Sequence, residues 1–86
     1  MKIVAKEIEV ISIMTKGLIT PLRLRMPRDD ETLQAIKIDK VISRKQEKLA
    51  GNLMIVFECQ SLIGEIEKRY QLKYELLTCR WMLFKI

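Results

Sequence analysis

The sequence predicts an all-β fold, a small antiparallel barrel of the SH3-like or OB type with about six strands. Segments rich in Ile, Val, Leu, Tyr and Phe are divided by only three glycines and two prolines, which mark the turns. Polar and apolar residues alternate without a fault over residues 69–76, as in a strand with one buried face. No long amphipathic helix pattern is present, and closure into a barrel removes unpaired sheet edges. Because 86 residues are too few for two cores, residues 1–86 are predicted to form one domain.

The first half of the chain supplies three of the expected strands. Residues 2–14 are rich in β-branched side chains and favour a strand, although their apolar spacing would also suit one face of a helix. Residues 22–26 and 36–42 alternate in polarity, and each is predicted to form one strand. The polar segment 27–31 is expected to connect these two strands.

The charged segment that follows has two interpretations. Ser43 and Gln46 have the spacing of a capping box, and Gly51 suits the position just after a helix. A short helical turn near residues 44–50 is therefore one interpretation, and a charged loop is the other.

Residues 53–60 and 69–76 are predicted to form a hairpin. A register in which paired residue numbers sum to 127 places every inward residue opposite another inward residue, and a slip of one residue would turn a whole apolar set outward. We expect a four-residue loop with Gly64 in the left-handed conformation, since Ile63 tolerates a positive φ poorly. The predicted pairs are Phe57–Tyr70, Ile55–Leu72, Leu53–Tyr74 and Glu58–Arg69.

The last segment, residues 79–86, is apolar on both faces. A hairpin whose paired numbers sum to 155 sets Trp81 on Tyr74, Leu83 on Leu72 and Arg80 opposite Glu75. A loop one residue longer would exchange the two faces, because Leu77-Thr78 is a weak turn signal.

The composition argues against catalysis. The chain has no histidine, which excludes His-based acid–base catalysis, Ser–His and Cys–His nucleophile pairs, and His metal ligands. The hydroxyl and thiol side chains have no adjacent base, and the glycines form no phosphate-binding loop. Asp29-Asp30-Glu31 is expected to be a solvated turn, because a hard-cation site needs six or more oxygens. We therefore expect a nonenzymatic protein with no cofactor, no metal and no small-molecule substrate.

The cysteines and the N-terminal charges indicate the compartment. Cys59 and Cys79 lie in apolar segments and are expected to be buried free thiols, with a disulfide as the alternative. Charges at Lys2, Lys6 and Glu7 interrupt any signal-peptide pattern, and no apolar run is long enough to span a bilayer. A cytoplasmic location without membrane contact is therefore expected.

The two hairpin registers together predict an interface. They place apolar side chains on the face opposite the core, which is more apolar surface than a small monomer usually leaves in water. Either another strand such as residues 11–13 crosses over and covers this face, or a protein partner or a second copy in a homodimer does. The predicted interface residues are Met54, Val56, Met82, Phe84 and Ile86.

A basic strand face predicts an alternative function, the binding of single-stranded nucleic acid. The net charge is +5, and six basic residues fall at the polar positions of strands, where they could follow a phosphate backbone. Glutamates on the same faces would neutralise part of this charge, and the aromatic residues fall mainly at buried positions. The predicted contact residues are Arg23, Arg25, Lys37, Arg69, Lys73 and Arg80.

Four segments, Ile36–Ile42, Glu47–Asn52, Phe57–Ser61 and Tyr74–Ile86, resemble the pattern of a family of short uncharacterised bacterial proteins. The resemblance covers most of the chain, more loosely before Pro27, and it brings no assigned activity and no site residues. The resemblance implies that genes of this family lie near genes for Y-family translesion DNA polymerases. The expected function is therefore a nonenzymatic interaction module, a small barrel that docks a protein partner or itself and serves as an accessory in DNA damage tolerance.

Overall fold

A computed structural model describes residues 1–28 and 30–86, and every regular element in it is a β-strand. The all-β prediction is confirmed, with seven strands where about six were expected. From Ile3 onward, the segment predicted over residues 2–14 forms a strand and not a helix. The strands are β1 (Ile3–Thr15), β2 (Leu18–Pro27), β3 (Leu33–Lys37), β4 (Lys40–Leu49), β5 (Asn52–Ile63), β6 (Ile66–Glu75) and β7 (Arg80–Lys85).

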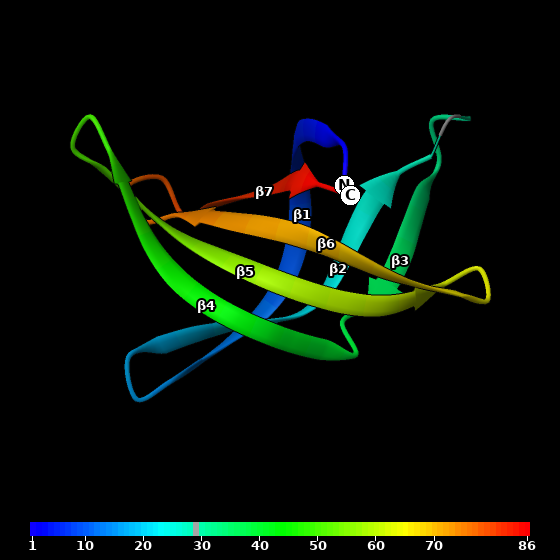
Figure 1. The fold of residues 1–86 in the computed structure, drawn as a ribbon, viewed down its shortest axis with the longest axis horizontal. Helices are drawn as coiled ribbons and strands as arrows, with labels where there is room; N and C mark the ends of the chain where they lie inside the picture. Colours follow the sequence, from blue (N-terminus) through cyan, green and yellow to red (C-terminus); the bar gives the residue numbers. More distant parts are fainter. Residues whose placement is uncertain (29) are drawn as a thin grey trace.

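The seven strands form one antiparallel sheet that curls into a half-barrel (Figure 1). The strand order is β3-β2-β1-β7-β6-β5-β4, so two meanders, β1–β3 and β4–β7, are joined where the first strand pairs with the last. The chain ends meet at this junction: Lys2 and Ile86 exchange two backbone hydrogen bonds of 2.7 and 2.9 Å. None of the described residues belongs to a helix that could cross a membrane.

The segment predicted as one strand over residues 36–42 is divided between β3 and β4. The chain turns at Ile38-Asp39, where the Ile38 N–H donates to the Leu22 carbonyl and the Asp39 N–H donates to the Gln60 carbonyl. The Asp39 carboxylate also accepts the Leu62 N–H at 2.8 Å. These bonds satisfy the backbone at the turn and carry the chain from one edge of the sheet to the other.

Three two-residue turns determine the hairpins β1–β2, β4–β5 and β5–β6. Their central residues, Lys16-Gly17, Ala50-Gly51 and Gly64-Glu65, all have positive φ, as a type I′ turn requires. The expected four-residue loop at Gly64 is therefore wrong, because Glu65 also adopts the left-handed conformation. The helix and loop interpretations of residues 44–50 are both wrong, since the segment belongs to β4 and its turn. The expected connection at residues 27–31 is a turn in which the Arg28 N–H donates to the Thr32 carbonyl, while Asp29 lies outside the described residues.

The predicted β6–β7 register is confirmed, and the predicted β5–β6 register is shifted by two residues. Tyr74 lies opposite Trp81, Leu72 opposite Leu83 and Glu75 opposite Arg80. In the β5–β6 hairpin the paired numbers sum to 129, so Phe57 lies opposite Leu72 instead of Tyr70. A shift of two residues leaves every side chain on its predicted face. The apolar sets of both hairpins therefore point where the sequence predicts as far as Phe84. Beyond it the β6–β7 register shifts, and Ile86 packs against the core instead of the opposite face.

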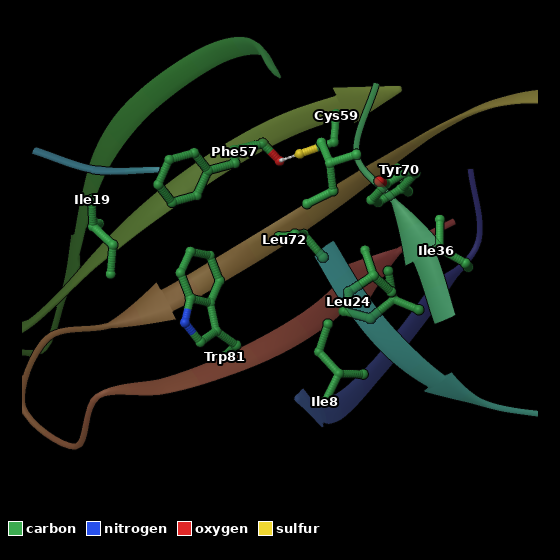
Figure 2. Close-up of a cluster of buried hydrophobic side chains, with 11 residues drawn as sticks. Ile8, Ile19, Leu24, Ile36, Phe57, Cys59, Tyr70, Leu72 and Trp81 are labelled. Atoms are coloured by element: carbon green, nitrogen blue, oxygen red, sulfur yellow. Dashed lines mark hydrogen bonds between the residues drawn. The ribbon is translucent and has the colours of Figure 1, made fainter. Parts of the chain in front are cut away.

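The core lies on the concave side of the sheet. Figure 2 shows Phe57, Trp81 and Ile19 on one side of Leu72, with Tyr70, Leu24 and Ile36 on the other. The rings of Phe57 and Tyr74 each lie about 5 Å from Trp81, at 5.4 and 4.9 Å between centroids, which is a favourable aromatic spacing. The buried apolar residues are Ile8, Ile19, Leu24, Ile36, Ile38, Phe57, Cys59, Tyr70, Leu72, Trp81 and Leu83.

The two cysteines differ in their surroundings. Both are free thiols, and Cys59 is fully buried as expected, whereas Cys79 is exposed, which corrects the expectation for that residue. Cys79 belongs to the β6–β7 turn and has a positive φ of 58°. The turn therefore carries it out of the apolar segment that suggested burial.

Candidate interaction surfaces

Four of the five residues predicted as an interface, Met54, Val56, Met82 and Phe84, are defined here as the outer patch. They alternate with the core residues along β5 and β7, so the outer patch lies on the convex face of the sheet, and all four side chains are half-buried. Ile86 packs against the core instead, because the β6–β7 register shifts and places Lys85 opposite Gln71, which corrects the predicted placement of Ile86. Residues 11–13 do not cross over this face, because they pair with β2 as part of β1 in the same sheet.

Lys73 covers the middle of the outer patch. The pairing places it between Val56 of β5 and Met82 of β7, and only 8% of its surface is exposed. Its ammonium Nζ lies 2.9 Å from Glu47 Oε2 and 3.7 Å from the centroid of the Phe84 ring. The apolar stem of the lysine can therefore lie on the patch while its charge is held by a carboxylate and an aromatic face.

Two hollows lie on the convex face. The larger has a volume of about 350 Å³, with Val56 and Phe84 as its apolar part, and the smaller, of about 150 Å³, includes Met54 and Met82. Both have charged side chains around them, and an apolar centre with a polar rim is the usual anatomy of a protein interface. The rim of the larger hollow contains Lys45, Gln46, Glu47, Gln71, Lys73 and Lys85, and that of the smaller contains Glu7, Glu75 and Arg80.

Hydrogen bonds fix the acidic side of this rim. Glu75 accepts hydrogen bonds from the Thr78 hydroxyl and from Asn52 Nδ2, the latter at 2.7 Å, and these bonds lower the pKa of its carboxyl. Arg80 lies 3.7 Å from Glu7 across the β1–β7 pair. The smaller hollow is therefore bordered by charges that are already paired, whereas the larger one has Lys45 and Lys85 beside it.

The basic residues predicted to contact nucleic acid do not form one continuous stripe. Arg23 and Lys37 lie directly opposite each other on β2 and β3, and Arg25 follows on the same face, 2.7 Å from Glu9. The other three lie across the sheet on β6 and β7: Arg69 is exposed, Lys73 is buried in its ion pair, and Arg80 is close to Glu7. The structure thus brings together Arg23, Arg25 and Lys37, beside a hollow of about 250 Å³ lined partly by Val10, Leu24 and Ala35.

A third surface was missed by the sequence reasoning. Beyond Glu9, β1 continues with β2 as a two-stranded hairpin, residues 10–22, defined here as the arm; in Figure 1 its turn lies at the lower left. Large apolar side chains on the arm are between 43% and 64% exposed: Ile11, Ile13, Met14, Leu18 and Leu22. The absence of any charged residue between Val10 and Thr15 is the sequence signal that could have revealed this surface.

The protein is a small antiparallel half-barrel with three candidate interaction surfaces: the outer patch, the basic cluster on β2 and β3, and the arm. Within residues 1–28 and 30–86, no group of three or more His, Cys, Asp or Glu side chains is placed to hold a metal ion. The carboxylate of Asp30 accepts hydrogen bonds from the Thr32 hydroxyl and N–H, which lower its pKa, as in a closed polar turn. No protein-family model, curated protein or solved structure matches the chain.

Proposed function

We propose that the protein is a nonenzymatic interaction module that docks a protein partner on the outer patch. The larger convex hollow carries this proposal, since it combines half-buried apolar side chains with a basic rim on a rigid sheet. Sheets position such groups more precisely than loops do. The SH3-like or OB-like classification belongs to the same proposal, because a curled antiparallel sheet with short hairpins is the architecture those barrels share.

The charges around the hollow favour an acidic partner segment with an apolar anchor. Lys45 on β4 and Lys85 on β7 lie on opposite sides of Val56 and Phe84, and the whole chain carries a net charge of +5. Lys73 is neutralised by Glu47, so Lys45 and Lys85 supply the attraction. An apolar side chain of the partner would pack on Phe84, and carboxylates on either side of it would face the two lysines.

Peptide selection against the immobilised protein tests the proposal. We expect selected peptides to contain an aromatic or aliphatic residue flanked by Asp or Glu, and their binding to be lost in Phe84→Asp and weakened by Lys45→Glu with Lys85→Glu. Lys68→Glu, an exposed charge change at the far end of β6, is the matched control and should bind as the wild type does. Peptides that bind Phe84→Asp and the wild type equally would contradict docking on the outer patch.

The proposal also covers the cellular location of the protein and the process that it serves. Two free thiols suit a reducing cytoplasm. The resemblance of residues 36–42 and 74–86 to a family associated with translesion polymerases supports an accessory role in DNA damage tolerance.

Binding of single-stranded nucleic acid is the second candidate function, favoured by the cluster of Arg23, Arg25 and Lys37. Fluorescence anisotropy with a labelled oligonucleotide should show affinity that falls steeply with salt and drops in Arg23→Ala with Arg25→Ala. Arg69→Ala, outside the cluster, should leave the affinity nearly unchanged. Absence of binding at low salt would end this candidate.

A further inference from the structure

The outer half of β1 is a strand with one unpaired edge. Its pairing with β7 ends at Ile8 opposite Trp81, whereas its pairing with β2 continues to Thr15 opposite Leu18. All five residues from Ile11 to Thr15 are exposed, three of them large and apolar. A hairpin of two strands is marginally stable in water by itself, and a sheet of three or more strands is the stable form. The β2 side of the arm is anchored by buried Ile19, whereas on the β1 side only Val10, at the base of the arm, packs against the core.

The free edges of β4, of β3 and of the part of β2 beyond β3 are protected against pairing with another chain. Edge strand β4 carries Lys40, Lys45 and Lys48, and edge strand β3 is only five residues long. The part of β2 beyond β3 contains Pro21, which has no N–H to donate. Lysine, proline and short length are the usual devices that prevent edge-to-edge association. The β1 segment from Val10 to Thr15 contains no charge and no proline, although its pairing with β2 has one irregularity, between Ile11 and Ser12.

We propose that two copies of this chain associate by antiparallel pairing of these β1 edges around a two-fold axis. The two arms then form one four-stranded sheet, which supplies the strands that each arm lacks. A second strand can satisfy the free N–H and C=O groups along this edge, which in the monomer are left to water. A second copy fits because the segment is uncharged and therefore does not repel itself, although each chain carries a net charge of +5.

The alternation of the strand selects the register of the pair. Two residues directly opposite each other must lie on the same face, so the numbers of a pair sum to an even value. With a sum of 24, Ile11 lies opposite Ile13 of the second copy on one face of the sheet. On the other face Ser12 lies opposite Ser12, and Val10 lies opposite Met14. Apolar residues therefore meet on both faces. A sum of 22 would set Glu9 against Ile13 and would need Ile8, whose edge is occupied by β7.

This interface is separate from the outer patch. Glu7 lies directly beside Met82, and Glu9 continues the acidic row toward Ile11, so charged side chains divide the two surfaces. A dimer built through the arms leaves both outer patches free for partner segments. The proposal is therefore independent of the function proposed above and fails or stands by its own test.

Light scattering on eluting protein, over a range of concentrations, tests the association. We expect the wild type to dimerise as its concentration rises and Ile13→Lys to remain a monomer, because the new charge would lie directly opposite apolar Ile11 of the second copy. Leu77→Lys, at an 87% exposed residue of the β6–β7 turn, is the matched control and should retain the dimer. A wild type that stays a strict monomer would overturn the proposal, and so would a dimer that Ile13→Lys leaves unchanged.

A cysteine at the proposed two-fold axis tests the register without depending on the stability of Ile13→Lys. In a Cys79→Ser background, Ser12→Cys should form an intermolecular disulfide in a glutathione redox buffer, while Leu62→Cys, exposed at the end of β5, should not. Equal cross-linking at both positions, or none at Ser12→Cys, would overturn the register. Acidic peptides that bind a strictly monomeric protein would leave the outer-patch function standing while this proposal fails.

Discussion

At the scale of single residues, one hydrogen bond joins the only buried hydroxyls that the described core contains. Ser61 and Tyr70 are both fully buried, and their hydroxyl oxygens lie 2.5 Å apart. A buried polar group that loses its partner retains its full desolvation cost, whereas removal of both groups is nearly neutral. The pair therefore contributes more to the specificity of packing than to the total stability.

Removal of one hydroxyl should cost more than removal of both. We expect Tyr70→Phe to lower the free energy of unfolding by about 1–3 kcal/mol, because the Ser61 hydroxyl is left unpaired. Ser61→Ala with Tyr70→Phe should recover part of that loss. Urea unfolding of the two single variants and the double variant gives the coupling energy. Strictly additive losses would contradict a direct interaction between the two hydroxyls.

The ion pair between Lys73 and Glu47, which covers the outer patch, should be similarly asymmetric. Glu47→Ala leaves the ammonium of Lys73 buried without its carboxylate, and we expect a loss of roughly 1–2 kcal/mol, reduced from the value for a fully buried pair because Glu47 is partly exposed. Lys73→Met keeps the apolar stem and removes the charge, and it should be nearly neutral. Thermal unfolding compares the two variants. A greater loss in Lys73→Met would mean that the charge itself stabilises the convex face.

At the scale of elements, the β5–β6 turn has its glycine at the less demanding position. Both Gly64 and Glu65 have positive φ, of 55° and 68°, whereas type I′ turns favour Asn or Asp first and Gly second. Glu65→Gly should therefore raise the free energy of unfolding by up to about 1 kcal/mol, since it removes the strain of a side chain in the left-handed region. Leu62→Gly, in the adjacent strand, is the control and should destabilise. An unchanged or lower stability in Glu65→Gly would contradict the role of backbone strain.

The elements also show which features a sequence determines. Alternation fixes the face of each side chain, and therefore the core residues Leu72 and Trp81 and the outer-patch residues Met82 and Phe84 could be predicted. It cannot distinguish registers that differ by two residues, and so the β5–β6 prediction was shifted. The turn determines the register, and Glu65 gave no sign that it would adopt a positive φ.

Strands at the edge of the sheet were the hardest to predict. Edge strand β4 carries charged side chains over most of its length, so it lacks the apolar pattern of a half-buried strand, and its Ser43 and Gln46 imitate a helix start. The exposure of the arm could not be predicted because Ile11, Ile13 and Met14 resemble core residues of a central strand. They lie in solvent because β7 begins at Arg80 and its pairing with β1 reaches no farther than Ile8.

At the scale of the whole molecule, stability should fall in alkaline solution. Burial raises the pKa of the Cys59 thiol from 9.0 to about 12 and also raises the pKa of Tyr70. The unfolded chain releases these protons at lower pH than the folded protein, so the stabilisation is complete below about pH 9 and declines as pH rises toward 12. Urea unfolding between pH 8 and pH 11 should show a loss approaching ~1.4 kcal/mol per pH unit for each group.

A variant without the thiol separates its share of this pH dependence. Cys59→Ala lowers stability near neutral pH because it leaves a cavity, but its free energy of unfolding should decline less steeply above pH 9. The comparison therefore uses the slopes and not the absolute values. Parallel curves for Cys59→Ala and the wild type would show that burial of the thiol does not contribute to alkaline unfolding.

The pairing of the first strand with the last has a consequence for biosynthesis. While the ribosome makes the intervening segments, at about 5–20 residues per second, the Ile3–Ile8 half of β1 must wait several seconds for β7. During this time the nascent chain exposes the apolar segment Val10–Thr15 together with the unpaired backbone edge of Ile3–Ile8. Polysomes hold many nascent copies of this chain close together, so the unpaired β1 edges of neighbouring copies could pair with each other before β7 is made. Binding of a chaperone to the nascent chain would therefore matter most before Trp81, the partner of Ile8, is synthesised.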